Sequence, residues 1–181
     1  MFDHVTIRVS DRDASRRFYE TVLGEPGPRP QYHRTYYGGF LLDPDGNSVE
    51  SVHRPGRTES GPPIDHLWLG VADLEASSRF WRAVVRSLGL GTGARDGLFI
   101  VSGERRHFAL VADGRPPTEH VHMAFPVADD EAVAGFHGVA LAAGYRDNGG
   151  PGERPEYHAG YVGAFVLDPD GNNVEAVNHN R

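Results

Sequence analysis

The chain has 181 residues, of which 39% are apolar and 24% charged, and a formal net charge of −7. These values are typical of a globular protein of one or two domains. The acidic charge and the lack of basic runs argue against a nucleic-acid partner, and no apolar run reaches the roughly 18 residues of a membrane span. Because the first residues also lack signal-peptide features, we expect a cytoplasmic protein.

Two residue types that carry much enzyme chemistry are absent from the sequence. There is no Cys, and all 18 basic residues are Arg. The first absence excludes disulfides, thiol nucleophiles and iron–sulfur clusters. The absence of Lys excludes Schiff-base chemistry and a Walker-type phosphate loop. Ten His residues remain, which favours metal or acid–base chemistry.

Residues 1–54 have the pattern of a strand, a helix and a two-strand return. Residues 2–11 alternate between apolar and polar side chains, which predicts a strand. Asp11 can cap the helix that follows. Residues 30–52 then give two strands joined by an Asp-Pro-Asp-Gly turn. The polar residues that come next, 55–62, are rich in Pro, Gly and Ser and predict a linker.

A complete two-module domain is predicted to follow the linker, over residues 63–181. Its first module, residues 63–113, restarts the earlier pattern with the same Asp-His pair, here Asp65 and His66. A helix is predicted from about residue 74 to residue 88. Residues 97–113 then contain two apolar runs around a polar turn, which predicts a hairpin.

The second half of this domain, residues 119–180, is a third strand–helix–strands module. Its first strand carries His122, and Asp129 can cap its helix. A loop rich in Asn, Gly, Pro and Glu is expected after the helix. The closing stretch, residues 155–177, is identical to residues 30–52 at 15 of 23 positions. A duplication this strong indicates that the chain is built from repeated modules.

Three residues at matching places in the modules form a candidate metal site: His66, His122 and Glu175. A carboxylate in an apolar strand needs a partner, because an unpaired buried charge is costly. Two imidazoles and one carboxylate make a facial triad that leaves open positions for water, substrate or dioxygen. A lone His is more often structural, but here the repeat carries His in all three modules. His4 and Glu50 are then either a partial second site or remnants in a degenerate copy.

These residues resemble the vicinal oxygen chelate superfamily, which includes glyoxalase I, fosfomycin-modifying enzymes, bleomycin-resistance proteins and extradiol dioxygenases. The resemblance covers nearly the whole chain and rests on DHV…V.D…F at the start of a module and AFVLDPDGNNVE at the end. It implies an α+β fold of paired βαβββ modules around a cleft with a divalent metal. The residues at 1–54 are then an extra, shortened module. We expect a homodimer with a small-molecule substrate.

The ligand set departs from glyoxalase I, which needs a second carboxylate in the last strand of the module at 63–113. The nearest equivalent position there is Ala109. Two His and one Glu resemble the dioxygenase branch more closely, which favours Fe²⁺, with Zn²⁺, Ni²⁺ or Mn²⁺ as alternatives.

Three residues before the Glu175 strand are candidates for catalysis: Tyr157, His158 and Tyr161. His158 is suited to act as a general acid or base, and Tyr161 to orient a substrate oxygen. The alternative is that these aromatic side chains pack within the Gly-rich loop.

A non-catalytic antibiotic-binding protein of the bleomycin-resistance type is the alternative function. The acidic charge and four aromatic residues are compatible with a planar, basic ligand. These four are Trp68, Trp81, Phe99 and Tyr161.

Overall fold

The computed structural model describes residues 2–21, 27–28, 34, 37–53, 64, 66–103 and 106–181. The predicted linker at 55–62 lies outside the described residues. The chain divides into two compact units: unit 1 comprises Met1–Ile7 and His66–Arg181, and unit 2 comprises Arg8–Asp65. Residues 2–7 therefore belong to the same compact unit as residues 66–181.

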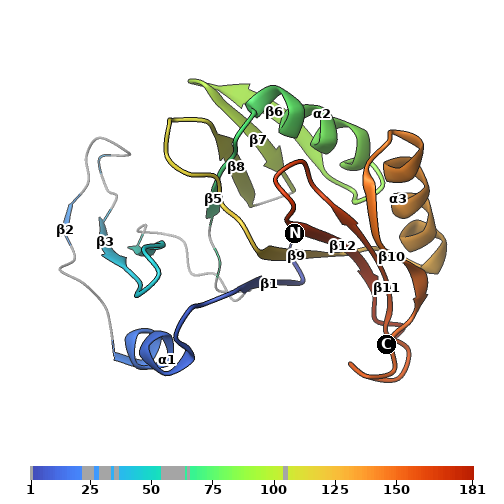
Figure 1. Ribbon diagram of the computed structural model, residues 1–181, viewed down its shortest axis with the longest axis horizontal. Helices are drawn as coiled ribbons and strands as arrows, with labels where there is room; N and C mark the ends of the chain where they lie inside the picture. Colours follow the sequence, from blue (N-terminus) through green and yellow to red (C-terminus); the bar gives the residue numbers. More distant parts are fainter. Residues whose placement is uncertain are drawn as a thin grey trace. The chain divides into compact units, whose positions relative to one another are not determined.

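Unit 1 contains two βαβββ modules, as the fold prediction requires (Figure 1). One is built from β5 (His66–Gly70), α2 (Leu74–Val84), β6 (Gly91–Arg95), β7 (Leu98–Ser102) and β8 (His107–Val111). The other is built from β9 (Val121–Pro126), α3 (Asp130–Ala142), β10 (Arg146–Glu153), β11 (Val162–Leu167) and β12 (Asn173–Asn178). The α+β fold of paired βαβββ modules is thus confirmed.

The two sheets of unit 1 share one strand order, in which the first strand of each module pairs with its last. The order is β5-β8-β7-β6 in one sheet and β9-β12-β11-β10 in the other. The second sheet gains a fifth strand, because β1 (His4–Ile7) pairs antiparallel with β9. The N-terminal residues thereby enter the sheet that carries Glu175.

The helix cap predicted at Asp129 is confirmed, and Asp73, for which no cap was predicted, caps the other helix of unit 1 in the same way. Asp73 accepts hydrogen bonds from the backbone N–H groups of Glu75 and Ala76, and Asp129 accepts one from Ala132. Each carboxylate satisfies N–H groups that have no partner in the first helical turn. The helix predicted to reach residue 88 ends at Val84.

The loop predicted after α3 is a strand instead. Residues Arg146–Glu153 form β10, which lies at one edge of its sheet. Its Gly and Pro content favoured a loop in the sequence, but an edge strand tolerates Pro because one side needs no ladder hydrogen bonds. The register of β10 against β11 shifts twice, between Asp147 and Gly149 and between Gly149 and Gly152.

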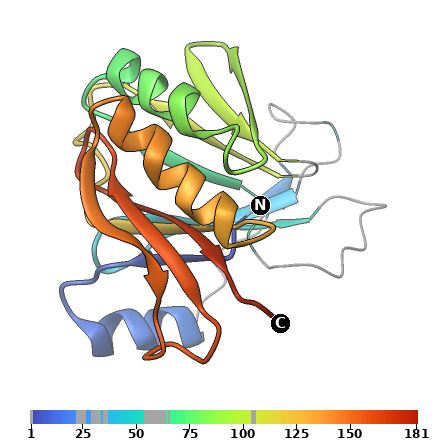
Figure 2. The same cartoon turned by 90° about the vertical axis from the view of Figure 1, so that its right-hand side faces the viewer.

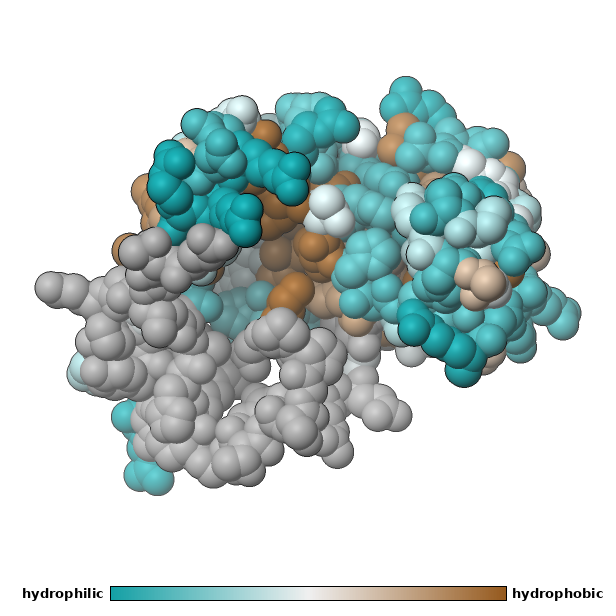
Figure 3. Space-filling model, turned by 90° about the horizontal axis from the view of Figure 1, so that it is seen from below, coloured by the Kyte–Doolittle hydropathy of each residue, from teal (hydrophilic) through white to brown (hydrophobic). Residues whose placement is uncertain are grey.

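The core of unit 1 is aromatic and joins the two modules. The Trp81 ring lies 4.7 Å from Phe108 and 5.8 Å from Phe125, so a helix of one module contacts both sheets. Figure 2 shows α2 and α3 side by side, and the Phe80 ring reaches Tyr145 at 4.8 Å. On the coloured part of Figure 3, hydrophilic residues cover most of the surface and a group of hydrophobic residues shows between them.

Unit 2 contains α1 (Arg12–Thr21) and a three-stranded sheet. The strand order is β2-β3-β4, from β2 (Gly27–Pro28), β3 (Tyr37–Leu42) and β4 (Ser48–His53). The turn between β3 and β4 is held by Asp43, whose carboxylate accepts hydrogen bonds from Asp45, Asn47 and Tyr19. In the described part of the chain, no helix is long and apolar enough to cross a membrane.

Candidate metal centre

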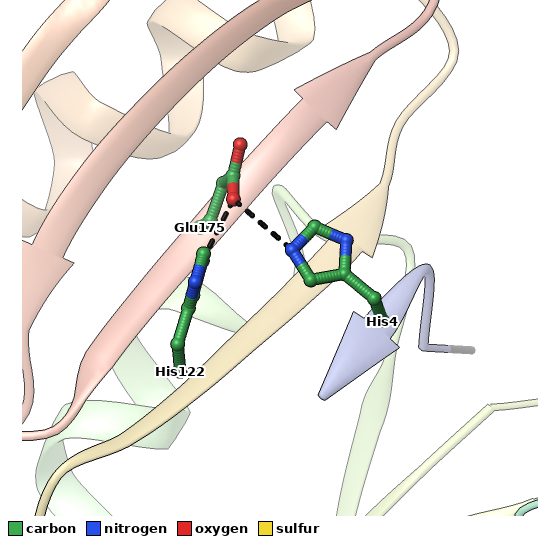
Figure 4. Close-up of side chains that lie close together, drawn as sticks. All are labelled: His4, His122 and Glu175. Atoms are coloured by element: carbon green, nitrogen blue, oxygen red, sulfur yellow. Dashed lines mark hydrogen bonds and ion pairs between the residues drawn. The ribbon is translucent and has the colours of Figure 1, made fainter. Parts of the chain in front are cut away.

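Three side chains from three neighbouring strands converge in unit 1: His4, His122 and Glu175 (Figure 4). Their ligand atoms all lie within 4.8 Å of one another. Oε2 of Glu175 is 2.8 Å from Nε2 of His122 and 3.9 Å from Nε2 of His4. Among the described residues, this is the one group of three or more metal-binding side chains that lies so close together.

The register of the sheet explains why these residues meet. His4 pairs with Ala124 across the β1–β9 ladder, and Ala124 pairs with Glu175 across the β9–β12 ladder. These three residues form one cross-strand row on one face of the sheet. His122 precedes Ala124 by two positions, so its side chain points to the same face.

Glu175 is held in place by burial and by a hydrogen bond to its carboxylate. Its side chain is 0% exposed, and Oε1 accepts a 2.7 Å hydrogen bond from the hydroxyl of Tyr161. Burial raises the pKa of the Tyr161 hydroxyl, and the hydrogen bond to Glu175 raises it further. Tyr161 therefore remains protonated at neutral pH and acts as a donor to the carboxylate.

A glycine on the next strand makes room for this carboxylate. A Cβ atom at Gly163 would lie 2.7 Å from Oε1 of Glu175 and 3.4 Å from Cζ of Phe165. The first distance is shorter than real Cβ contacts, so any larger residue would displace the carboxylate or the strand. Glycine at position 163 thus leaves room for the Glu175 carboxylate where it lies.

The donor set fits a divalent metal ion. Two imidazoles and one carboxylate are ligands of Fe²⁺, Zn²⁺, Ni²⁺ and Mn²⁺ sites. Glu175 is buried, whereas the side chains of His122 and His4 are 23% and 39% exposed. A bound ion would therefore rest on a buried carboxylate and face the accessible side of the sheet.

His66, predicted as a ligand, is not in this group; His4 is in it instead. His66 lies on β5 in the other sheet of unit 1, where its ring stacks on His107 at 6.2 Å. The partial second site predicted at His4 and Glu50 combines residues of two units. His4 belongs to unit 1, and Glu50 lies on β4 of unit 2. A pairing of these two residues stays a prediction.

The three predicted catalytic residues lie close together beyond Glu175. The Tyr161 ring is 4.8 Å from Tyr157 and 5.3 Å from His158. Tyr161 is buried and bonded to Glu175, so its hydroxyl positions a candidate ligand rather than standing free for substrate. Tyr157 is exposed, and His158 contacts the backbone oxygen of Ala159 and the ring of His179.

Sequence reasoning missed Asp3, His179 and Gly163. Asp3 contacts His4 through one carboxylate oxygen and His179 through the other, at 2.7 and 2.6 Å. Burial alone would raise the pKa of Asp3, but the hydrogen bonds from His4 and His179 lower it overall. The repeated Asp-His pair was a signal for Asp3; the position of His179 in the C-terminal tail offered none.

Comparisons with known proteins place this fold in a family. Residues 63–176 match the sequence model of the Glyoxalase/Bleomycin resistance protein/Dioxygenase superfamily. No curated protein sequence is significantly similar to the chain.

Three solved structures illustrate the likeness. A glyoxalase/bleomycin resistance protein from Albidiferax ferrireducens T118 is 27% identical, with a TM-score of 0.54, over 64% of this chain and 97% of its own. The V278E glyoxalase I mutant from Zea mays is 25% identical, with a TM-score of 0.59, over 86% of this chain and 58% of its own. A lactoylglutathione lyase from Agrobacterium tumefaciens shares the fold at 20% identity and a TM-score of 0.50, over 68% of this chain and 97% of its own. By its matched sequence and its paired modules, this chain belongs to the glyoxalase/bleomycin resistance protein/dioxygenase superfamily.

Proposed function

We propose that this protein is a divalent-metal-dependent enzyme acting on a small substrate that offers neighbouring oxygen atoms to the metal. The observation that carries the proposal is the convergence of His4, His122 and Glu175 within 4.8 Å, with the carboxylate fully buried. Burying a carboxylate is costly unless it is paired. Packing alone does not require a buried carboxylate beside two accessible imidazoles, whereas a metal site does.

The ion would supply Lewis-acid chemistry, polarising substrate oxygens, or would bind a catecholate and dioxygen if it is iron. His4, His122 and Glu175 would hold it and leave the remaining coordination positions open to substrate. Tyr161 keeps one oxygen of Glu175 engaged, which leaves Oε2 directed toward both His rings. The protein's contribution is thus a fixed set of three ligands on one sheet face.

A site of the dioxygenase type is favoured over one of the glyoxalase I type. The register places Ala109 of β8 at the position that Glu175 occupies in β12, because Ala109 pairs with Trp68 as Glu175 pairs with Ala124. The second carboxylate expected for glyoxalase I is therefore absent from that strand. With two His and one Glu, Fe²⁺ is the favoured ion.

The antibiotic-binding alternative receives less support from the aromatic residues. Trp81, Phe99 and Tyr161 are buried in the interior of unit 1 and offer little surface for stacking. Trp68 is 51% exposed and is the one of the four predicted aromatic residues that is accessible. A planar ligand would need more than one such surface to be held by stacking.

The test is elemental analysis of protein purified without a His tag, for the wild type and four alanine variants. We expect close to one iron, zinc, nickel or manganese ion per chain, lost in His4→Ala, His122→Ala and Glu175→Ala. His66→Ala is the matched control, because it removes the repeat equivalent of His4 from the other sheet. It should retain the ion.

The outcome separates the competing assignments. Loss of the ion in His66→Ala but not in His4→Ala would restore the ligand set predicted from the sequence. The absence of any ion, even after reconstitution with each of these metals, would contradict the enzyme proposal and favour the binding protein. The homodimer and the cytoplasmic location stay predictions, the first open to light scattering.

A further inference from the structure

A chain of polar contacts runs from His4 to the C-terminal tail. Nδ1 of His4 lies 2.7 Å from Oδ1 of Asp3, and Oδ2 of Asp3 lies 2.6 Å from Nε2 of His179. Nδ1 of His179 lies 2.9 Å from Nε2 of His158, which also contacts the Arg181 guanidinium at 3.2 Å. The Asp3 carboxylate is thus shared between two imidazole rings.

The contact with Asp3 fixes which nitrogen of His4 carries a proton. A carboxylate oxygen only accepts, so His4 donates from Nδ1–H to Asp3. In the neutral ring, Nε2 then keeps its lone pair, and Nε2 is the atom that faces Glu175. A metal ion binds the unprotonated nitrogen of a His ring, so this tautomer is the one that the candidate centre needs.

His179 contacts the other oxygen of Asp3 and also packs against Tyr161, the residue bonded to Glu175. Its ring packs edge-on against Tyr161 at 5.2 Å, and Tyr161 donates its hydroxyl hydrogen to Glu175. His158 stacks on His179 at 5.1 Å. His179 therefore contacts the residue that supports each ligand: Asp3, which holds His4, and Tyr161, which holds Glu175.

We propose that Asp3 is the positioning residue of the His4 ligand, and that His179 fixes Asp3 in turn. This inference rests on the proposed metal site and adds two residues to it. Asp3 acts through His4 by setting its tautomer and ring orientation, and it does not contact the ion. The C-terminal tail then belongs to the metal centre through His179.

The first experiment measures Co²⁺ binding to the full chain by calorimetry and by the visible absorption of the bound ion. Asp3→Asn removes the charge and leaves one oxygen to serve two rings. Carboxylates that hold a ligand His typically contribute roughly 10- to 100-fold in metal affinity, so we expect a loss of that size and a changed Co²⁺ spectrum. A merely structural role would not change the spectrum.

Asp147→Asn is the matched control. Asp147 contacts Nε2 of His137 at 2.9 Å in the same unit, so the variant removes an equivalent Asp–His pair from a His outside the ligand group. It should bind Co²⁺ as the wild type does. Equal affinity in Asp3→Asn and Asp147→Asn would overturn the proposal.

Two further variants separate positioning from folding. Asp3→Glu keeps a carboxylate and should restore part of the affinity. His179→Phe keeps a ring that can pack on Tyr161 but removes the donor to Asp3. Because the Asp3 carboxylate remains, we expect a loss of Co²⁺ affinity below the roughly 10-fold that is the smallest loss expected for Asp3→Asn. Thermal unfolding of each metal-free variant identifies those that lose affinity because they unfold.

The tautomer of His4 can be measured without metal, by ¹⁵N NMR of the imidazole nitrogens. We expect Nδ1–H in the wild type and a mixture of tautomers in Asp3→Asn. An Nε2–H tautomer in the wild type would overturn the proposal, whatever the affinities. If the wild type binds no Co²⁺ at all, the proposed function itself fails, whereas wild-type binding with unchanged Asp3→Asn affinity refutes the positioning role alone.

Discussion

The two modules of unit 1 have the same strand order and pair their first and last strands in the same register, yet one sheet gathers a ligand set and the other does not. In one sheet, β9 carries His122 and pairs with β12, which carries Glu175. In the other sheet, β5 carries His66 and pairs with β8, which carries Ala109 at the position equivalent to Glu175. A His at the start of the first strand is therefore not sufficient for a site.

Two further differences accompany the loss of the carboxylate. The sheet with Glu175 has Gly163 on β11, where the Glu175 side chain needs space, and the other sheet has Leu98 at the corresponding position on β7. The sheet with Glu175 also receives β1, which supplies His4, whereas β5 is an edge strand in its sheet. The comparison teaches that the carboxylate, the space for it and the added strand β1, which supplies the third ligand, occur together in one sheet.

The largest effect is expected from removing the carboxylate that distinguishes the two sheets. Glu175→Gln keeps the size of the side chain but removes the charge that a divalent ion needs. We expect Co²⁺ affinity to fall by at least about 100-fold, more than for a residue outside the ligand set. Calorimetric titration checks this, with the exposed Glu131→Gln as the control. Equal binding by both variants would show that the two sheets do not differ in the way proposed.

The turn before β12 is expected to make stability depend on pH. Burial raises the pKa of Asp168 to about 6, despite hydrogen bonds from Asn172. The folded protein therefore binds a proton at Asp168 more tightly than the unfolded chain does. The contribution of Asp168 to the free energy of unfolding falls as the pH rises from about 4 to about 6. The loss amounts to at most about 3 kcal/mol. Urea unfolding of the wild type and Asp168→Asn should diverge across this range, with the variant gaining in relative stability.

The copy of this turn in unit 2 gives the opposite sign and serves as the control. Burial would raise the pKa of Asp43, but hydrogen bonds from Asn47 and Tyr19 lower it overall. The contribution of Asp43 to the free energy of unfolding is present above the ordinary pKa of Asp and is lost as the pH falls. Asp43→Asn should therefore lose relative stability as pH rises from acid toward about 4. The same trend in both variants would refute the difference between the turns.

Filling the space beside Glu175 should have a smaller effect than removing the carboxylate. Gly163→Ala places a Cβ 2.7 Å from Oε1 of Glu175, so we expect destabilisation of about 1–3 kcal/mol and weaker Co²⁺ binding. Gly150→Ala on β10 is the control, because its Cβ would meet no atom within 4 Å. Thermal unfolding and metal titration of the two variants test whether the space is specific to the site.

The effect of removing the donor to Glu175 is expected to depend on whether the ion is bound. Tyr161→Phe removes a hydroxyl that lies 2.7 Å from Oε1 and keeps the ring. A hydrogen bond to a charged group contributes roughly 1.5–3 kcal/mol, but a bound ion compensates part of this loss by neutralising the carboxylate. The variant should therefore lose more stability without Co²⁺ than with it, as measured by urea unfolding. Equal losses in both conditions would indicate that Tyr161 does not support the ligand.

The sequence predicted the modules and two of the three grouped side chains because repeats preserve strand position. His122 and Glu175 lie at matching places in a single module, and their adjacency follows from the order of its strands. The choice of His4 over His66 depends on which strand lies beside β9, a long-range pairing that no local pattern encodes. The hydrogen bond from His179 to Asp3 joins residues 176 positions apart in the sequence and was equally hidden. β10 was missed because Gly and Pro signal turns, whereas edge pairing overrides that preference.

The placement of β1 also has a consequence for aggregation. β1 occupies the edge of its sheet and satisfies backbone groups of β9 that would otherwise be unpaired. Exposed strand edges template pairing between chains. A protein shortened to the family-matched residues 63–176 would lose His4 and uncover the edge of Val121–Pro126. We expect it to self-associate, so that the family boundary drawn from sequence is not a safe place to cut this chain.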